Sequence, residues 1–150
     1  NTRAIYAGGN EPSFVTLIDF VTIATTGGGT DFGDLTLARG YQASLSNSVR
    51  GLNAGGYASS TAQNTIEFVT IATTGGGTDF GDLTEARGYH ASLSNSVRGL
   101  NAGGYKASNN VSNTIDFVII ATTGNAQDFG DLLSINYGTS GSSDSHGGLE

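Results

Sequence analysis

The sequence predicts an all-β fold, and two observations carry that prediction. The first is composition: strand-forming Thr, Val, Ile, Phe and Tyr alternate with Ser, Asn and Gly, and the 150 residues include 24 glycines but one proline. The second is repetition: IATTGGGTDFGDLT stands at residues 23–36 and again at 71–84, and IATTGNAQDFGDLL follows at 120–133. We therefore expect a single domain of stacked β repeats, long enough to bury a core.

The repeat has a period of 48 to 49 residues. Residues 20–57 align with residues 68–105 without a gap. They differ at two positions only, Leu37 against Glu85 and Gln42 against His90. A period near 50 is typical of a propeller blade or of another stacked unit. We expect four strands in each unit, which in the second unit are residues 40–47, 50–57, 64–74 and 79–84.

The order of motifs within a unit resembles the kelch repeat. A glycine pair closes the second strand (AGGY at 54–57 and 102–105), the third strand ends in a hydrophobic run, and Ala-Arg follows a short fourth strand. The tandem units are similar to kelch-like repeats of bacteriophage proteins, marine phages and cyanophages included, some of them presumed virion components. The resemblance implies a kelch-like β-propeller with three four-stranded blades. The kelch tryptophan is missing, and Phe32, Phe80 and Phe129 would take its packing role.

Three blades are too few for a propeller, which typically has four to eight. Residues 132–149 align with the start of a unit, and the N-terminus begins where that start stops, with Arg3 in the place of Arg50. We therefore expect residues 1–150 to form a half-propeller that closes as a six-bladed ring by homodimerisation. A C-terminal strand of one chain, at about 134–146, would complete the N-terminal blade of the other. A piece of a longer array and a ring of other stoichiometry stay open as alternatives.

The glycine-rich segment is not a phosphate loop by sequence, because no lysine or helix follows it. Aspartates flank it in three pairs, Asp31 with Asp34, Asp79 with Asp82, and Asp128 with Asp131. We interpret Asp34, Asp82 and Asp131 as turn residues or as ion-pair partners of the arginines that follow, Arg39 and Arg87. The weaker alternative is a calcium site formed by Asp31, Asp34, Asp79 and Asp82. The glycine pairs at Gly55, Gly56, Gly103 and Gly104 are expected to form structural turns.

Repeated tyrosines and arginines are the candidate ligand-binding residues. These are Tyr41, Tyr57, Tyr89, Tyr105, Arg39 and Arg87. Tyrosine combines apolar area with a polar tip, which suits a glycan, and arginine suits an anion. The competing interpretation is that the tyrosines pack and that the arginines join neighbouring blades. His90 and His146 lack partners at metal-ligand spacing, so we expect both on the surface.

The sequence predicts a non-enzymatic protein without a metal or cofactor. Near-identical units produce repeated surfaces, whereas a catalytic site is one asymmetric group of residues. A net charge of −7 with six dispersed basic residues argues against nucleic-acid binding, and no apolar run reaches membrane-helix length. We expect a structural or adhesive module of a phage virion or tail, acting in assembly or host-surface binding. A glycan-binding, lectin-like propeller and a designed or evolution-model propeller without a ligand are the alternatives. A phage origin would place the chain in the virion, and otherwise we expect a soluble protein.

Overall fold

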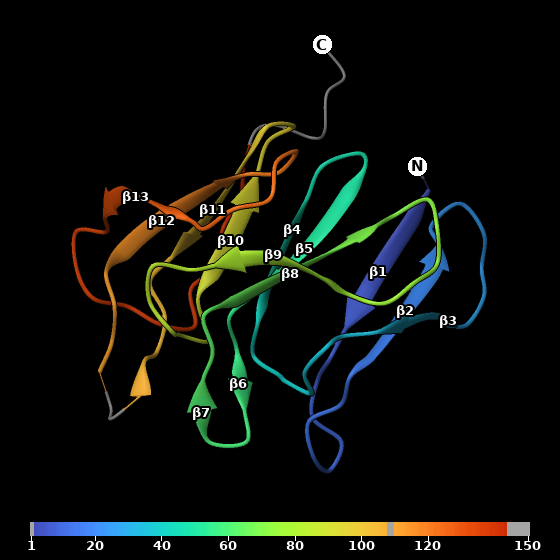
Figure 1. The fold of residues 1–150 in the computed structure, drawn as a ribbon, viewed down its shortest axis with the longest axis horizontal. Coiled ribbons are helices and arrows are strands. Elements are labelled where there is room, and N and C mark those ends of the chain that lie inside the picture. Colours follow the sequence, from blue (N-terminus) through green and yellow to red (C-terminus); the bar gives the residue numbers. More distant parts are fainter. Residues whose placement is uncertain (1, 108–109, 144–150) are drawn as a thin grey trace.

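The computed structural model describes residues 2–107 and 110–143, and this part of the chain is all-β (Figure 1). It contains thirteen strands in four antiparallel sheets and no α-helix, which confirms the predicted fold class. Because these residues form no α-helix, none of them forms a helix that is able to span a bilayer.

Three of the sheets correspond to the three sequence repeats, which we call the first, second and third units. The first unit has three strands, β1 (Arg3–Ala7), β2 (Leu17–Thr22) and β3 (Thr30–Asp34), in the order β1-β2-β3. The second has four, β4 (Ala43–Ser46), β5 (Arg50–Ala54), β8 (Thr65–Thr70) and β9 (Thr78–Asp82), in the order β4-β5-β8-β9. The third has β10 (Ala91–Ser94), β11 (Arg98–Ala102), β12 (Thr114–Ile119) and β13 (Gln127–Asp131), in the same order.

The strands are shorter than the sequence pattern suggests. The third strand of the second unit ends at Thr70 rather than at residue 74, because the glycine-rich segment leaves the sheet. A small hairpin of β6 (Tyr57–Ala58) and β7 (Thr61–Ala62), which the sequence analysis does not predict, forms the fourth sheet. Each unit also has a β-bulge just before an acidic residue of the strand that is β2, β8 or β12, at Ile18/Asp19, Ile66/Glu67 and Ile115/Asp116.

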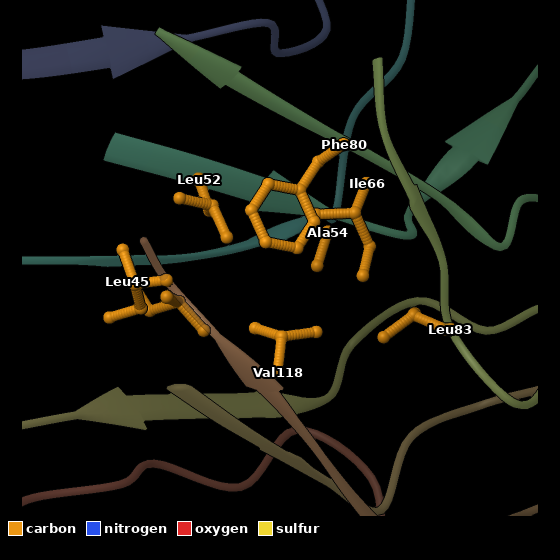
Figure 2. Packing of buried hydrophobic residues seen from close by; sticks show 8 residues of the cluster. Leu45, Leu52, Ala54, Ile66, Phe80, Leu83 and Val118 are labelled. Atoms are coloured by element: carbon orange, nitrogen blue, oxygen red, sulfur yellow. The ribbon is translucent and has the colours of Figure 1, made fainter. Parts of the chain in front are cut away.

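The hydrophobic core lies between neighbouring units. In Figure 2, Leu45, Leu52, Ala54, Ile66, Phe80 and Leu83 of the second unit face Val118 of the third. A second cluster joins Ile18, Phe32 and Leu35 of the first unit to Val69 of the second. Each sheet therefore has two apolar faces and needs a neighbour on both sides to bury them.

The sheets follow one another so that β4 and β10, the first strands of the second and third units, lie side by side (Figure 1). This arrangement is compatible with a β-propeller, although the described residues close no ring. The first unit lacks the strand that corresponds to β4 and β10. Residues 134–143 of the predicted C-terminal strand form no strand in the structure, and residues 144–146 lie outside the described part of the chain.

Candidate functional site

Arg39, between β3 and β4, is fully buried (0 % exposed). Its guanidinium lies 3.4 Å from the carboxylate of Glu67 on β8. It also donates hydrogen bonds to three carbonyl oxygens of the second unit, those of Gly55 (3.2 Å), Thr65 (2.9 Å) and Asn53 (3.3 Å). Glu67 accepts hydrogen bonds from the backbone N–H and the hydroxyl of Thr36, which follows the first unit. The network therefore fastens the first unit to the second.

Arg87 repeats this arrangement one unit later. Its side chain is fully buried, and 2.9 Å separate its Nη2 from Oδ1 of Asp116 on β12. Asp116 accepts hydrogen bonds from the N–H (3.1 Å) and the hydroxyl (2.7 Å) of Thr84. The nearest carboxylates to the two arginines are thus Glu67 and Asp116, and Glu85 lies 3.9 Å from Arg87. The expected pairs with Asp34 and Asp82 are corrected accordingly, because both arginines point into the following sheet.

Burial dominates the electrostatics of these networks. It lowers the pKa of Arg39 and of Arg87, against the opposing charge of their carboxylate partners. Burial also raises the pKa of Glu67, while Arg39 and the hydrogen bond from Thr36 lower it. Buried, paired guanidinium groups are not available to an external anion. Among the candidate ligand-binding residues, this leaves Tyr41 and Tyr89 with exposed side chains, and Tyr57 and Tyr105 half-buried.

The four candidate tyrosines lie close together on one surface. The rings of Tyr41 and Tyr89 stack with centroids 4.4 Å apart, and the ring of Tyr57 lies 5.9 Å from that of Tyr89. The hydroxyl of Tyr57 donates a hydrogen bond to the carbonyl of Tyr105 (3.0 Å). The ring of Tyr105 in turn contacts that of Tyr137 at 5.3 Å. We call these five tyrosines the aromatic surface.

Tyr41 and Tyr89 adopt left-handed backbone conformations, with φ of 60° and 56°. This region costs a non-glycine residue roughly 1–3 kcal/mol. Backbone hydrogen bonds hold the conformation, from Tyr89 N–H to Tyr41 O (2.9 Å) and from Gly138 N–H to Tyr89 O (2.7 Å). Gly138 occupies the corresponding place after the third unit and has a φ of 67°. Glycine would adopt this backbone conformation without strain, yet the chain has tyrosine at both positions. This indicates that the tyrosine side chains have a role that glycine could not fill.

The glycine pairs form turns that contact the next unit. Gly55, Gly56, Gly103 and Gly104 all have positive φ, between 61° and 112°. The N–H of Gly56 donates to the carbonyl of Arg87 (2.9 Å), and a Cβ on Gly56 would lie 2.7 Å from the carbonyl of Gly40. Glycine is required here by conformation and by space.

The glycine-rich segment that recurs in the sequence also joins neighbouring units. The N–H groups of Gly75 and Gly77 donate to the carbonyls of Phe32 (2.7 Å) and Asp34 (2.8 Å) on β3. A Cβ on Gly33 would lie 2.6 Å from the backbone of Gly75. The segment is therefore a contact between sheets, in addition to the turn that its glycines suggest.

The second set of arginines bridges units through carbonyl groups. Arg3 donates to the carbonyl of Ile71 (3.0 Å), and Arg50 donates to that of Ile120 (3.0 Å). Each guanidinium also lies over a phenylalanine of its own unit, 4.4 Å from the ring centroid in both cases. These contacts agree with the interpretation that arginines tie neighbouring units together.

The paired aspartates lie on the strand that follows each glycine-rich segment. Oδ1 of Asp34 accepts a hydrogen bond from the hydroxyl of Thr16 (2.7 Å). Oδ1 of Asp128 accepts one from the N–H of Gly130 (3.1 Å), which is a local turn. Within residues 2–107 and 110–143, no three His, Asp or Glu side chains are grouped so as to hold a metal ion.

The expectation that His90 is a surface residue is wrong. The side chain is buried at the junction of the second and third units, and neither ring nitrogen has a hydrogen-bond partner among the described residues. Burial and the nearby charge of Arg87 lower the pKa of His90 to about 3, against a smaller opposing effect of Asn101. The backbone turns inward at Gly88 and Tyr89, and this turn places the side chain of the next residue, His90, in the junction. His146 lies outside the described residues.

A cleft of about 580 Å³ follows β4 and β10 where they lie side by side. Its lining is mainly neutral and polar, and includes Ser44, Ser46, Asn47, Ser92, Ser94 and Asn95. Arg3 adds a positive charge to this lining.

Sequence reasoning missed the buried acids Glu67 and Asp116. The sequence does contain a signal for them, because one acidic residue recurs inside the apolar strands β2, β8 and β12, as Asp19, Glu67 and Asp116. An acid repeated in an apolar strand implies a buried partner. No protein-family model matches the chain, and a search of curated proteins finds no match.

Proposed function

We propose that the chain is a non-enzymatic, self-associating structural module, half of a kelch-like propeller whose ring a second copy closes. The observation that carries this proposal is a pair of uncovered faces at the two ends of the array. The leading face belongs to the first unit, and the trailing face belongs to the third unit. Several groups on one face match partners on the other.

On the leading face, Ile23 is 69 % exposed, whereas its equivalents Ile71 and Ile120 are 8 % and 0 % exposed. The difference arises because the second and third units each pack on a preceding unit. The glycine-rich segment of the first unit is uncovered as well: nothing lies within 4 Å of a Cβ built on Gly28, whereas a Cβ on its equivalent Gly76 would lie 3.0 Å from the carbonyl oxygen of Asp34.

On the trailing face, Phe129 is 52 % exposed, whereas its equivalents Phe32 and Phe80 are each 2 % exposed. A Cβ built on Gly130 meets nothing within 4 Å, although its equivalent Gly81 lies against the glycine-rich segment of the third unit. The trailing face therefore presents the surface of β13. Glycine-rich segments pack on the equivalent surfaces of β3 and β9 within the chain.

The junctions within the chain indicate how the two faces would meet. Gly27 of a second copy would donate to the carbonyl of Phe129, as Gly75 does to that of Phe32. Arg98 would donate to the carbonyl of Ile23 of that copy, as Arg3 and Arg50 do within the chain. Two copies joined in this way at both ends form a six-bladed ring with two-fold symmetry.

Apolar burial at the two junctions would offset part or all of the cost of association, which is about 4–15 kcal/mol. Complete burial of one large apolar side chain stabilises by about 1.5–3 kcal/mol. Covering the exposed parts of Ile23 and Phe129 thus contributes roughly 2–4 kcal/mol at each junction by the same scale. A ring has two such junctions, so its apolar contacts alone contribute roughly twice that amount, before hydrogen bonds are considered.

Light scattering tests the proposal. We expect twice the 15.2 kDa of one chain at micromolar concentration. Ile23→Asp should give a folded monomer, because it places a charge in the junction. The control is Leu37→Glu, which changes an exposed leucine to the residue found at the equivalent Glu85, and it should remain dimeric. A monomeric native chain, or equal masses for the two variants, would refute the proposal.

The aromatic surface supports a second proposal, a glycan-binding role in adhesion to a host surface. Tyr41 and Tyr89 are exposed and strained, and their rings offer apolar area next to a hydroxyl. Two copies would double the number of weak sites and raise avidity. A glycan array probed with the native protein and with Tyr41→Ala tests this role. Assignment to a phage virion rests on the sequence resemblance, and it remains part of this proposal.

A further inference from the structure

The first unit is one strand short of the other two. By register, β1 corresponds to β5 and β11: β1 pairs with β2 as β5 pairs with β8. In the second unit β5 also pairs with β4 on its other side, and in the third unit β11 pairs with β10. Among the described residues, no strand pairs with that side of β1. The position next to β1 is therefore a vacant strand site.

A groove lies at this vacant position. Its volume is about 300 Å³, and β1 provides Ala4 and Ile5 to its wall while the second unit provides Leu45, Leu52 and Val69. The groove thus combines apolar side chains with an unpaired strand edge. Such an edge favours an extended segment that supplies the missing backbone hydrogen bonds.

The C-terminal segment of the described chain follows the path of such a first strand, beyond the third unit. The N–H of Gly104 donates to the carbonyl of Asn136 (2.8 Å), as that of Gly56 does to Arg87 (2.9 Å). The hydroxyl of Ser143 donates to the carbonyl of Ser94 (3.0 Å), as the hydroxyl of Ser94 does to the carbonyl of Ser46 (2.7 Å) one unit earlier.

Residues 140–143 are therefore placed like β4 and β10, although within the described part of the chain they are not assigned to a strand. They occur at the trailing face, whereas the vacant site occurs at the leading face. In the proposed ring these two faces meet, so the segment of one copy arrives next to β1 of the other.

We propose that residues 140–143 of a second copy occupy the vacant site and complete the first sheet as its fourth strand. This inference rests on the proposed ring, and it specifies the segment and its register. In the second unit, Ala43 lies opposite Ala54 and Ser46 lies opposite Gly51. The equivalent antiparallel register places Ser140 opposite Ala7, and Ser143 opposite Ala4.

The composition of the segment suits a strand that pairs between chains. SGSS replaces the ASLS of the other two first strands, so Ser142 takes the place of Leu45 and Leu93. A polar, glycine-containing strand gains little from apolar burial. Its affinity would come from backbone hydrogen bonds and from the adjoining junction. Because an unrelated strand edge lacks that junction, the segment would pair with it only weakly.

Disulfide trapping tests the register, because the chain contains no cysteine. Asn47 N–H donates to Arg50 O in the β4–β5 turn, which makes the next pair, Ser46 with Gly51, a non-hydrogen-bonded pair. Such pairs have Cα atoms about 4.5 Å apart, within disulfide range. The matching positions in the proposed strand pair are Ser143 and Ala4.

One copy carries Ala4→Cys and a second copy, with a size tag, carries Ser143→Cys. The two are mixed and oxidised with glutathione disulfide. We expect a cross-linked heterodimer in high yield on a non-reducing gel. The control replaces Ser143→Cys by Ser142→Cys, which moves the thiol to the opposite face of the strand and should lower the yield at least fivefold.

Light scattering of the same mixtures before oxidation separates the two proposals. A dimeric mass without the expected cross-link, or with equal yields from positions 142 and 143, overturns the strand proposal and leaves the ring standing. A monomeric mass overturns the ring, and with it the strand exchange. A dimeric mass with the position-specific cross-link supports both.

Discussion

His90 occupies the position at which the first-to-second junction has Gln42, which permits a controlled test of its buried ring. The folded chain holds the pKa of His90 at about 3, against 6.5 for an unperturbed histidine, mainly because of burial. The unfolded chain therefore takes up a proton in this range that the folded chain does not. The contribution of His90 to the free energy of unfolding is therefore fully present above pH 6.5, and it decreases as the pH falls from 6.5 towards 3.

The magnitude follows from the difference in pKa. Each pH unit between the two values is worth about 1.4 kcal/mol. Lowering the pH from 6.5 to 4.5 should thus reduce the free energy of unfolding by about 3 kcal/mol through His90 alone. His90→Gln removes this contribution. The replacement should be tolerated, because Gln42 fits the equivalent position and donates a hydrogen bond to the carbonyl of Ala7.

Urea unfolding followed by circular dichroism, at pH 7.5 and pH 4.5, measures the effect. The native chain should lose about 3 kcal/mol more than His90→Gln between the two pH values. Carboxylates such as Glu67 titrate equally in both proteins, so their contributions cancel in the comparison. The reciprocal variant Gln42→His should increase the pH dependence. Equal losses in the native chain and in His90→Gln would show that the ring is not buried as described.

Three further predictions concern the junctions between units. Asp116→Asn removes the nearer of the two carboxylates beside the buried guanidinium of Arg87 and leaves only Glu85, 3.9 Å away. It should cost about 3 kcal/mol in urea unfolding, at the lower end of the range for a broken buried ion pair. Gly81→Ala and Gly130→Ala introduce similar backbone strain, but only the Cβ at position 81 would approach another backbone, at 2.6 Å. Gly81→Ala should therefore lower the free energy of unfolding by about 1–3 kcal/mol more than Gly130→Ala does, measured by thermal unfolding of the monomer. Asn136→Arg gives the proposed junction the arginine that the internal junctions have, facing Asp19 of a second copy. It should tighten dimerisation roughly tenfold, about 1.4 kcal/mol, in sedimentation equilibrium, and the gain should vanish in Asp19→Asn.

The junctions explain why the sequence is repeated so faithfully. A residue such as Phe80 contacts its own sheet and the next one, so a change at one position affects two units. The glycine-rich segment illustrates the same point: Gly75 must fit against Gly33, one unit away. Selection or design acting on one junction therefore constrains the equivalent residues of every unit.

Much of the fold was predictable from the sequence. Composition and the 48-residue period sufficed for the all-β class, the unit boundaries and the turns at the glycine pairs, because these depend on local conformation and on self-similarity. Strand ends were less predictable: residues 71–74 include Ile71 and two threonines, which favour strands, yet they leave the sheet because the following glycines bond to the preceding unit. The β6–β7 hairpin depends on a local register that no periodic signal marks.

The candidate site was predictable in part. The tyrosines gather because they recur at equivalent turns, and turns of stacked units necessarily align. The main partners of Arg39 and Arg87 were not predictable from spacing, since Asp34 and Asp82 extend from the preceding strand while the arginines enter the next sheet. Glu85, two residues before Arg87, contributes a second and more distant carboxylate. The same inward turn of the chain buries His90, which its polar neighbours along the sequence do not indicate.

By itself, the sequence determined that this chain folds into repeated antiparallel units with apolar residues on both faces of each sheet. That follows from periodic hydrophobicity and from turn residues, which act over a few positions. Only the tertiary structure decided which residues join the units and which stay uncovered. Phe32, Phe80 and Phe129 occupy equivalent positions, and their different exposure depends on whether another sheet lies against them. Burial is a property of neighbours in space, and equivalent residues at the two ends of an array have different neighbours.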